Sequence, residues 1–405
     1  MELILQQGLE HQQIPVERLA KVFENVGKTN GFFYTNPKIN LADSTLKANI
    51  KNIQNDVHPE LRGSNEIKDI LNLDIKMETG TGKTYVYAET IFELHKRYGI
   101  NKFIIAVPSL PIKAGSASFL GDSYVKRHFR DVCGYNSEIE LCVLEAMKKK
   151  KGKSFFPSMV RDFVQGSNQL TNKIYVLIVN MQLLSGSTKM LKDEYDYSIE
   201  GFYRPFDAIR ATKPFVIIDE PHRFDKENKA YNTIVNEIKP QCIIRFGATF
   251  SQKLVGAGKN KVWVKDYHNL LYDLNACDAF NQNLIKGVAK EHFEPLSKKE
   301  EKVKIVSIES RTSASFKYSS VDVNKSYKLN SGDSLAIISP AFEGLFIDGI
   351  TNNSVLFSNG QEKVVGNEFD VDIFMESYQD GMLKLAIQRH FETERANFNR
   401  TPKIK

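Results

Sequence analysis

The alternation of apolar and polar residues near position 71 predicts a strand that leads into a glycine-rich turn. The apolar positions of this strand lie two residues apart, at Leu71, Leu73, Ile75 and Met77. After the turn, apolar residues return at helical spacing, at Tyr87, Ile91, Leu94 and Tyr98. Gly99 follows this run, where the C-terminus of a helix favours glycine, so the segment predicts a strand, a turn and a helix.

Four other apolar runs predict further strands. Each run is short, rich in β-branched or aromatic residues and nearly continuous, as expected where helices cover both faces of a parallel sheet. The runs are Phe103–Val107, Ile174–Val179, Phe215–Ile218 and Cys242–Phe246. Helical patterns lie between the strands, for example over 16–26 and 231–238. This alternation predicts a doubly wound α/β domain, in which ligands bind at the carboxyl ends of the strands.

The pattern of the chain changes from about residue 300. Short strand-like runs follow one another and are separated by turn signals such as Asn330-Ser331-Gly332. These runs lie around 317–323, 334–338, 345–350 and 354–358. They predict a small antiparallel β module, and a polar amphipathic helix over about 375–396 closes the chain.

Composition and charge set outer limits on the function. The length of 405 residues leads us to expect two or three domains, and the charge excess of 55 − 49 = +6 permits a polyanionic partner without requiring one. The four cysteines form no C-x-x-C pair, which favours reduced structural thiols. The N-terminus lacks a signal-peptide pattern and no apolar run reaches the roughly 20 residues that span a bilayer, so we expect a cytoplasmic protein.

A run of lysines, Lys148–Lys151 with Lys153, allows two interpretations. The simpler one is a solvated loop, and the alternative is contact with a phosphate backbone.

The turn after residue 77 has the composition of a phosphate-binding loop. Backbone N–H groups of a Gly-rich turn and the N-terminus of the following helix point at one spot and attract a polyphosphate there. Lys83 would reach the β- and γ-phosphates, and the Thr84 hydroxyl would bind Mg²⁺. The full pattern has Gly where Met77 stands, so an ordinary turn with a surface lysine is the alternative. The flanking strand and helix argue against that alternative.

A second candidate motif follows the apolar run 215–218, which delivers Asp219 and Glu220 at its end. Asp219 can hold Mg²⁺, and Glu220 can polarise the water that attacks the γ-phosphate. An acidic turn after a strand is common, and the pair becomes specific only together with the loop at Lys83. Other polar or small residues also follow strand ends, namely Pro108, Ser109, Asn180, Gly247, Ala248 and Thr249.

These segments resemble the motifs of superfamily-two helicases and translocases. Asp219-Glu220-Pro221-His222 is similar to the DEAD/DEAH box, and Gly247-Ala248-Thr249 is similar to the motif that links hydrolysis to nucleic-acid movement. The resemblance implies that Thr79, Gly80, Thr81, Gly82, Lys83 and Thr84 bind ATP and Mg²⁺, and that Gln12 reads the adenine edge. It implies that His222 and the Gly247–Thr249 segment couple the nucleotide state to DNA, and that Pro108, Ser109 and Asn180 contact the DNA backbone.

Within that superfamily, the chain resembles the Res subunit of type III restriction enzymes. The resemblance covers most of residues 1–295 through the loop at 77–84 and the segments at 103–109, 218–222 and 247–250, with 270–274 after them. It implies a RecA-like motor that uses ATP and Mg²⁺ on double-stranded DNA, in complex with a modification methyltransferase (Mod) subunit. Members of this family cut DNA with a C-terminal nuclease domain.

The resemblance also implies a division of the chain. We expect a RecA-like ATP-binding domain over 1–268, the start of a second motor domain over 269–298, a β-rich insertion over 299–372 and a helix over 373–405. We find no arginine motif that would complete the ATP site and no P-D…E-x-K nuclease set, so we expect a fragment, a truncated product or a split subunit. Two alternatives stay open: a general DNA or RNA helicase-like ATPase, and a non-catalytic assembly module that holds ATP.

Overall fold

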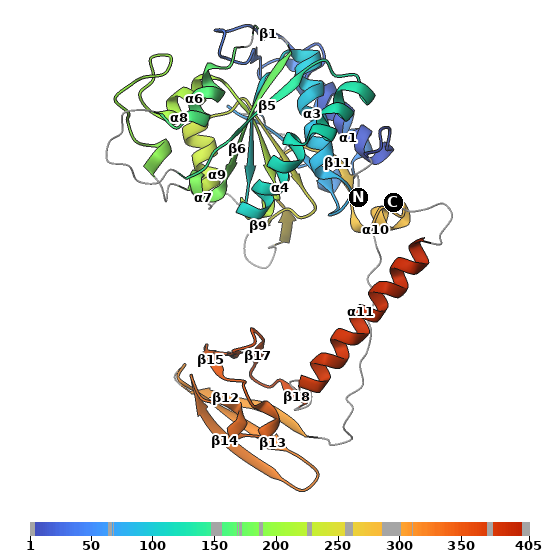
Figure 1. Ribbon diagram of the computed structural model, residues 1–405, viewed down its shortest axis with the longest axis vertical. Coiled ribbons are helices and arrows are strands. Elements are labelled where there is room, and N and C mark those ends of the chain that lie inside the picture. Colours follow the sequence, from blue (N-terminus) through green and yellow to red (C-terminus); the bar gives the residue numbers. More distant parts are fainter. Residues whose placement is uncertain are drawn as a thin grey trace. The chain divides into compact units, whose positions relative to one another are not determined.

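The computed structural model divides the chain into two compact units, Met1–Gly287 and Val288–Lys405 (Figure 1). The structure describes residues 5–63, 67, 69–146, 156–167, 169, 172–185, 189–224, 229–255, 262–285, 301–309, 311–370 and 376–398. The lysine run Lys148–Lys151 with Lys153 lies outside the described residues, so both of its interpretations stay predictions.

A parallel sheet forms the centre of the first unit. Its seven strands lie in the order β11-β3-β8-β7-β4-β6-β5, and all six neighbouring pairs are parallel. The strands are β3 (Leu71–Met77), β4 (Lys102–Val107), β5 (Glu138–Val143), β6 (Lys173–Asn180), β7 (Phe215–Asp219), β8 (Cys242–Gly247) and β11 (Leu270–Leu274). The five predicted strands are therefore confirmed, whereas β5 and β11 were not predicted.

Helices cover both faces of this sheet, as the apolar runs predict (Figure 1). Alternate residues of β4 belong to two separate cores: Phe103 and Ile105 pack on the side of α1 and α3, and Ile104 and Ala106 pack on the side of α6, α8 and α9. The helices of the unit are α1 (Glu10–Val22), α2 (Ser44–Ile53), α3 (Lys83–Tyr98), α4 (Leu110–Gly121), α5 (Ser123–Arg127), α6 (Ser158–Gln165), α7 (Met181–Leu184), α8 (Pro205–Ala211), α9 (Lys229–Thr233) and α10 (Ala276–Asn281). The predicted doubly wound α/β architecture is confirmed.

Two of the predicted helices have different bounds in the structure. The helix expected over 16–26 is α1, which begins at Glu10 and ends at Val22. The helix expected over 231–238 is α9, which passes at Ile234 into a turn of π-helix that ends at Ile238. Helix α3 ends as predicted, because Gly99 adopts a left-handed conformation with φ of 73°.

The strand at 270–274 corrects one part of the expected domain division. We expected the segment 269–298 to begin a second motor domain, but β11 pairs with β3 at the edge of the first sheet. Its residues Leu271 and Leu274 are buried in the same core as α1 and α3. This segment was assigned from the family resemblance and not from a strand pattern, so its pairing with β3 was not expected. The remaining division stays a prediction.

Smaller elements complete the first unit. A short antiparallel pair is formed by β1 (Lys28–Thr29) and β2 (Lys38–Ile39). A second pair is formed by β9 (Gln252–Val255) and β10 (Val262–Lys265), directly after the sheet strand β8. Cys142 and Cys242 are buried and all four cysteines are free. None of the described helices is long and apolar enough to cross a membrane.

The second unit contains two antiparallel sheets, which confirms the predicted type of module. One sheet has the order β14-β13-β12-β18, with β12 (Lys302–Glu309), β13 (Ser313–Ser319), β14 (Asn324–Asn330) and β18 (Glu368–Asp370). The other has the order β15-β16-β17, with β15 (Ile347–Ile350), β16 (Ser354–Phe357) and β17 (Glu362–Val364). Both contribute to a single core that includes Phe316, Phe342 and Phe357. The closing helix α11 (Glu376–Phe398) agrees with the expected 375–396.

Two of the predicted runs in this unit are wrong in type or bounds. The run at 317–323 spans the end of β13 and the turn that leads into β14. The run at 334–338 contains a 3₁₀-helix, Leu335–Ile337, rather than a strand. Short apolar runs fit either a strand or a helical turn, and periodicity alone does not separate the two.

Candidate nucleotide-binding site

The turn between β3 and α3 is a loop whose backbone needs glycine at two positions. Gly80 and Gly82 have φ of 86° and 91°, a left-handed conformation that is strained for other residues. The loop is held by its own hydrogen bonds, because the Thr81 hydroxyl donates to the Glu78 carbonyl at 2.7 Å. The Thr79 N–H donates to the Glu78 carboxylate at 2.8 Å. The loop therefore has a defined shape directly before the first turn of α3.

Lys83 opens helix α3 and is largely buried, with 9% of its surface exposed. Its Nζ lies 3.4 Å from the Glu220 carboxylate and 3.5 Å from the Met77 carbonyl. The structure thus brings together the predicted phosphate-binding lysine and the predicted catalytic carboxylate, which are 137 residues apart in sequence (220 − 83 = 137). Both residues lie at the carboxyl edge of the sheet, as the strand-end pattern predicts.

Asp219 ends strand β7, and its carboxyl group is buried and has a raised pKa. One carboxylate oxygen, Oδ1, has no hydrogen-bond partner among the residues that the structure describes. The pKa of Asp219 is raised to about 6, chiefly by burial and also by the nearby Glu220 carboxylate, while the Lys83 ammonium opposes both effects. A buried, unpaired carboxylate oxygen close to the phosphate loop suits a hard divalent cation such as Mg²⁺.

Glu220 has a backbone conformation that is rare for its residue type. Its φ of 54° and ψ of 64° lie in the left-handed region, and its N–H donates to the Phe246 carbonyl of β8 at 3.0 Å. This conformation directs the carboxylate between Lys83 and His222, whose Nδ1 lies 3.4 Å from Glu220 Oε2. A strained backbone at such a point is typical of functional sites, where the surrounding structure fixes one side-chain position.

Gly247 allows the segment after β8 to approach the segment after β7. A Cβ atom at Gly247 would lie 2.5 Å from Cδ of Pro221, so only glycine fits without displacement. Ala248 is half-buried and Thr249 is exposed. The structure therefore brings the predicted coupling residues Gly247 and His222 onto neighbouring segments, whereas Thr249 faces solvent.

Gln12 reaches the phosphate loop from helix α1. Its Nε2 donates to the Thr81 carbonyl at 3.2 Å, and a Cβ atom at Gly82 would lie 2.3 Å from the same nitrogen. The side chain is buried, with 9% exposed. The loop and the first turn of α1 are thus in contact, which places Gln12 beside the predicted nucleotide site, while its contact with adenine stays a prediction.

The predicted DNA-contacting residues lie on the neighbouring strands of the sheet. Asn180 ends β6 and pairs in register with Val107 at the end of β4, directly before Pro108 and Ser109. Asn180 is buried, and within the described part of the chain its Oδ1 has no hydrogen-bond partner. Pro108 and Ser109 are half-buried. The three residues share one edge of the sheet, and their contact with DNA stays a prediction.

A buried ion pair supports this edge and was not predicted from the sequence. Arg245 of β8 donates to Asp74 of β3 through Nε at 2.6 Å and Nη2 at 2.9 Å, and Nη2 also donates to the Asp266 carbonyl at 2.7 Å. The Asp74 carboxylate also accepts the His268 N–H at 2.6 Å. The pair joins the strand that leads into the phosphate loop to the strand that leads to Gly247. In the sequence, the pair is visible only as a charged residue inside each of two apolar runs, Asp74 in 71–77 and Arg245 in 242–246.

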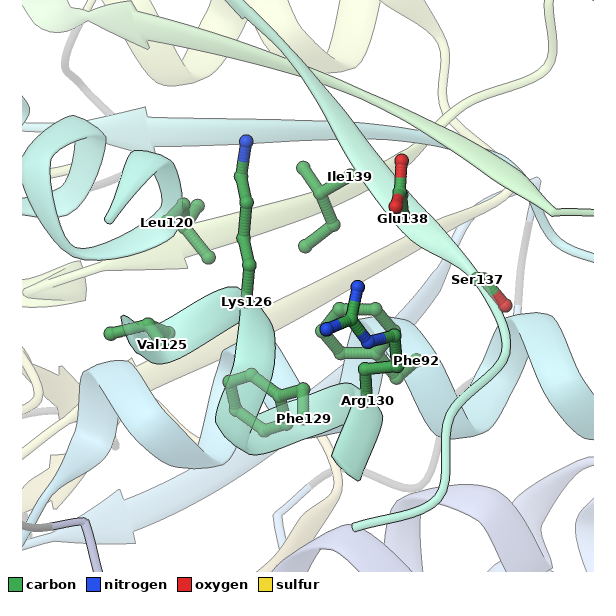
Figure 2. A pocket seen from close by; sticks show the side chains of 9 residues that line it. All are labelled: Phe92, Leu120, Val125, Lys126, Phe129, Arg130, Ser137, Glu138 and Ile139. Carbon is green, nitrogen blue, oxygen red and sulfur yellow. The ribbon is translucent and has the colours of Figure 1, made fainter. Parts of the chain in front are cut away.

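A separate cavity of about 30 Å³ lies away from the phosphate loop, between α3 and the edge strand β5 (Figure 2). Its floor is apolar, and the side chains of Lys126, Arg130 and Glu138 stand around it. That volume holds only one or two water molecules, so it does not take a nucleotide. The lining residues are Phe92, Leu120, Val125, Lys126, Phe129, Arg130, Ser137, Glu138 and Ile139.

The fold and the site together define a class of protein. A parallel sheet with a phosphate loop after β3, an Asp-Glu pair after β7 and Gly-Ala-Thr after β8 is the architecture of a RecA-like domain of the superfamily-two helicase type. The family model described as "Type III restriction enzyme, res subunit" matches residues 40–252. The chain therefore belongs to the family of type III restriction enzyme Res subunits, and the resemblance seen in the sequence is confirmed.

Individual relatives agree with this family. The Res subunit of the type III restriction-modification enzyme EcoP15I of Escherichia coli is 36% identical over 415 residues, which cover 99% of this chain and 40% of that subunit. The EcoPI Res subunit of Escherichia phage P1 is 34% identical over 414 residues, with the same two coverages. The chain thus spans about 40% of the length of these relatives.

Solved structures are more distant. A DEAD box protein from the hyperthermophile Methanococcus jannaschii aligns with 45% of this chain and 40% of its own, at 18% identity and a TM-score of 0.27. The strand order of the sheet, and not this weak likeness, defines the fold.

Proposed function

We propose that the chain is the ATP-binding and ATP-hydrolysing motor portion of a type III restriction enzyme that acts on double-stranded DNA together with a Mod subunit. The observation that carries the proposal is the meeting of Lys83 and Glu220 at 3.4 Å, beside a loop that requires Gly80 and Gly82. Membership of the Res family supports the DNA substrate and the Mod partner.

Each residue of the site has a task in this proposal. The loop N–H groups and Lys83 hold the β- and γ-phosphates of ATP. Thr84 and Asp219 would hold Mg²⁺, which neutralises charge on the phosphates when it is bound. Glu220 orients the attacking water and accepts its proton. To do so, Glu220 must first lose its contact with Lys83, which happens when Lys83 binds the phosphates instead. Gln12 would read the adenine edge from α1.

The contact between Lys83 and Glu220 suggests the order of events. The ammonium of Lys83 and the carboxylate of Glu220 neutralise one another inside a largely buried site. Phosphate oxygens offer Lys83 a stronger partner, and Glu220 is then free to face the water. His222, 3.4 Å from Glu220, is placed to respond to this exchange and to transmit it toward Gly247 and the DNA-facing edge.

Nucleotide binding by the full 405-residue chain tests the proposal. A fluorescent ATP analogue should bind in the presence of Mg²⁺, and Lys83→Ala should weaken the affinity at least about tenfold because a charge-assisted contact with phosphate is lost. Lys96→Ala is the matched control, since Lys96 is an exposed lysine of the same helix. Equal affinity of wild type and Lys83→Ala would overturn the assignment of the site.

Hydrolysis and DNA dependence form the second part of the test. Glu220→Gln should keep ATP binding and lose turnover, because the amide cannot accept the proton of the attacking water. Stimulation of wild-type turnover by duplex DNA would support the motor role. ATP binding with no turnover under any DNA condition would favour the alternative of a non-catalytic assembly module.

A further inference from the structure

Three strands of the second unit, β12, β13 and β14, have one face on the core and one outer face (Figure 1). Successive residues of a strand alternate between the two faces, and Val303, Phe316 and Leu329 point into the core. The outer face consists of four rows of cross-strand partners: Lys302-Ser319-Asn324, Lys304-Lys317-Ser326, Ser307-Ser315-Lys328 and Glu309-Ser313-Asn330. The exposed Val306 lies at the bulge of β12, outside these rows.

The composition of this outer face fits a phosphate backbone better than a protein surface. Its twelve residues are four lysines, five serines, two asparagines and one glutamate. Lysine, serine and asparagine are side chains that donate hydrogen bonds to phosphate oxygens. The core of a protein–protein interface is instead enriched in aromatic residues, Met and Arg, and it is depleted in Lys and Ser.

Two of the lysines lie directly opposite one another on neighbouring strands. Lys304 of β12 and Lys317 of β13 are cross-strand partners, and both side chains are exposed. Their Cβ atoms are therefore about 5 Å apart, a position in which like charges lower the stability of a sheet. A face that only meets solvent is more stable with charges of both signs interspersed, so this pair favours an anion as the ligand of the face.

The described carboxylates at the margins of this face are engaged by other lysines. The Glu368 carboxylate of β18 lies 3.6 Å from Lys302 Nζ, although Glu368 is the cross-strand partner of Lys304. Glu309 forms an ion pair with Lys328. Within the part of the chain that the structure describes, the central Lys304 has no ion-pair partner, and the same holds for Lys317 opposite it.

We propose that the outer face of β12, β13 and β14 binds the sugar-phosphate backbone of duplex DNA, with Lys304 and Lys317 at its centre. This proposal rests on the proposed function, because it adds a contact to the same DNA substrate. A duplex carries a negative charge every ~1.7 Å along its axis, so lysines on neighbouring strands meet several phosphates. Such contacts position the DNA and do not read its bases.

The salt dependence of duplex binding by the full chain tests the proposal. Two labelled duplexes of unrelated sequence are titrated by anisotropy, without nucleotide, over a range of salt concentrations. Each lysine that neutralises a phosphate adds about 0.9 to the slope of log affinity against log salt concentration, so Lys304→Gln/Lys317→Gln should lower the slope by about 1.8 for both duplexes. A slope equal to that of wild type, or a wild-type chain that binds neither duplex, would overturn the proposal.

Matched variants separate this face from the net charge of the chain. Lys325→Gln/Lys384→Gln removes the same number of charges elsewhere in the unit, since Lys325 is the partner of the core-packed Tyr318 and Lys384 lies on α11. This control should keep the wild-type slope, and an equally lowered slope would refute a role for the outer face. The single variants Lys304→Gln and Lys317→Gln, each with a slope lowered by about 0.9, serve if the double variant does not fold.

Two further measurements distinguish the other outcomes. Labelled poly-L-glutamate, a model of an acidic protein surface, should bind more weakly than the duplex at the same salt concentration; tighter binding would overturn DNA as the ligand and favour a protein. A wild-type slope in Lys304→Gln/Lys317→Gln would refute this DNA contact even if Lys83→Ala loses ATP. Conversely, a lowered slope in a chain that binds no ATP would refute the motor assignment and leave the DNA contact standing.

Discussion

We predict that Asp219, a residue of the proposed metal site, lowers the free energy of unfolding, because its carboxylate is buried. Its pKa is about 6 in the folded chain against an ordinary 3.8, chiefly because of burial. Between these two values the folded state binds the proton more tightly than the unfolded state, so stability falls as the pH rises through this window and stays low above it. The shift of about two pH units corresponds to roughly 3 kcal/mol at pH 7.5.

Replacement by asparagine should therefore stabilise the protein while removing a proposed metal ligand. The buried amide costs about 1–2 kcal/mol, since it also lacks a partner, so Asp219→Asn should gain about 1–2 kcal/mol at pH 7.5. At pH 4.5 the cost of the wild-type carboxylate is only about 1 kcal/mol. The advantage of the variant should accordingly shrink by about 2 kcal/mol between pH 7.5 and pH 4.5.

Urea unfolding followed by far-ultraviolet circular dichroism measures this difference in free energy at the two pH values. Asp196→Asn, at an exposed carboxylate of the same unit, controls for the loss of one negative charge. In parallel, Mg²⁺-dependent binding of the ATP analogue should be lost in Asp219→Asn. A stability difference that does not change with pH would refute the reasoning, because it would show that the carboxylate is not neutralised in this window.

Three further predictions concern the surroundings of the site. Gly247→Ala should destabilise the fold by about 1–3 kcal/mol in thermal unfolding, because the added Cβ meets Pro221 at 2.5 Å. Gly115→Ala, in an open position of helix α4, should instead stabilise it by about 0.5–1 kcal/mol. Arg245→Leu should cost about 3–5 kcal/mol in urea unfolding because it leaves the buried Asp74 carboxylate unpaired, and adding Asp74→Leu should recover part of that loss. If Arg245→Leu alone were as stable as the wild type, the proposed role of the ion pair would be contradicted.

The sequence predicted the elements that depend on a local pattern of apolar residues. It did not predict features that depend on pairing with strands far away in the sequence. The alternating run at 71–77 and four nearly continuous apolar runs identified five strands of the parallel sheet, because a strand covered on both faces leaves few alternatives. Strand β5 escaped notice because its polar residues Glu138 and Glu140 are exposed at the edge of the sheet. The place of β11 in the first sheet depends on pairing with β3, which no local pattern carries.

The candidate site shows the same division. Glycine at positions 80 and 82, with Lys83 after them, follows from the loop conformation and was visible in the sequence. The left-handed backbone of Glu220 was not visible, because glutamate does not favour it and only the fold imposes it. The ion pair between Asp74 and Arg245 joins residues 171 positions apart, beyond the reach of periodicity.

The features that break local rules gather at one place, and this is the strongest argument for a site there. Asp219 has a buried oxygen without a partner, Glu220 has a strained backbone and Lys83 is buried against it. Each of these features costs stability. Polyphosphate and a divalent cation would satisfy all three at once, since the cation pairs the free oxygen and the phosphates take up the lysine. We therefore expect nucleotide with Mg²⁺ to stabilise the first unit more than either component alone, and an equal shift in melting temperature with nucleotide alone would contradict this joint site.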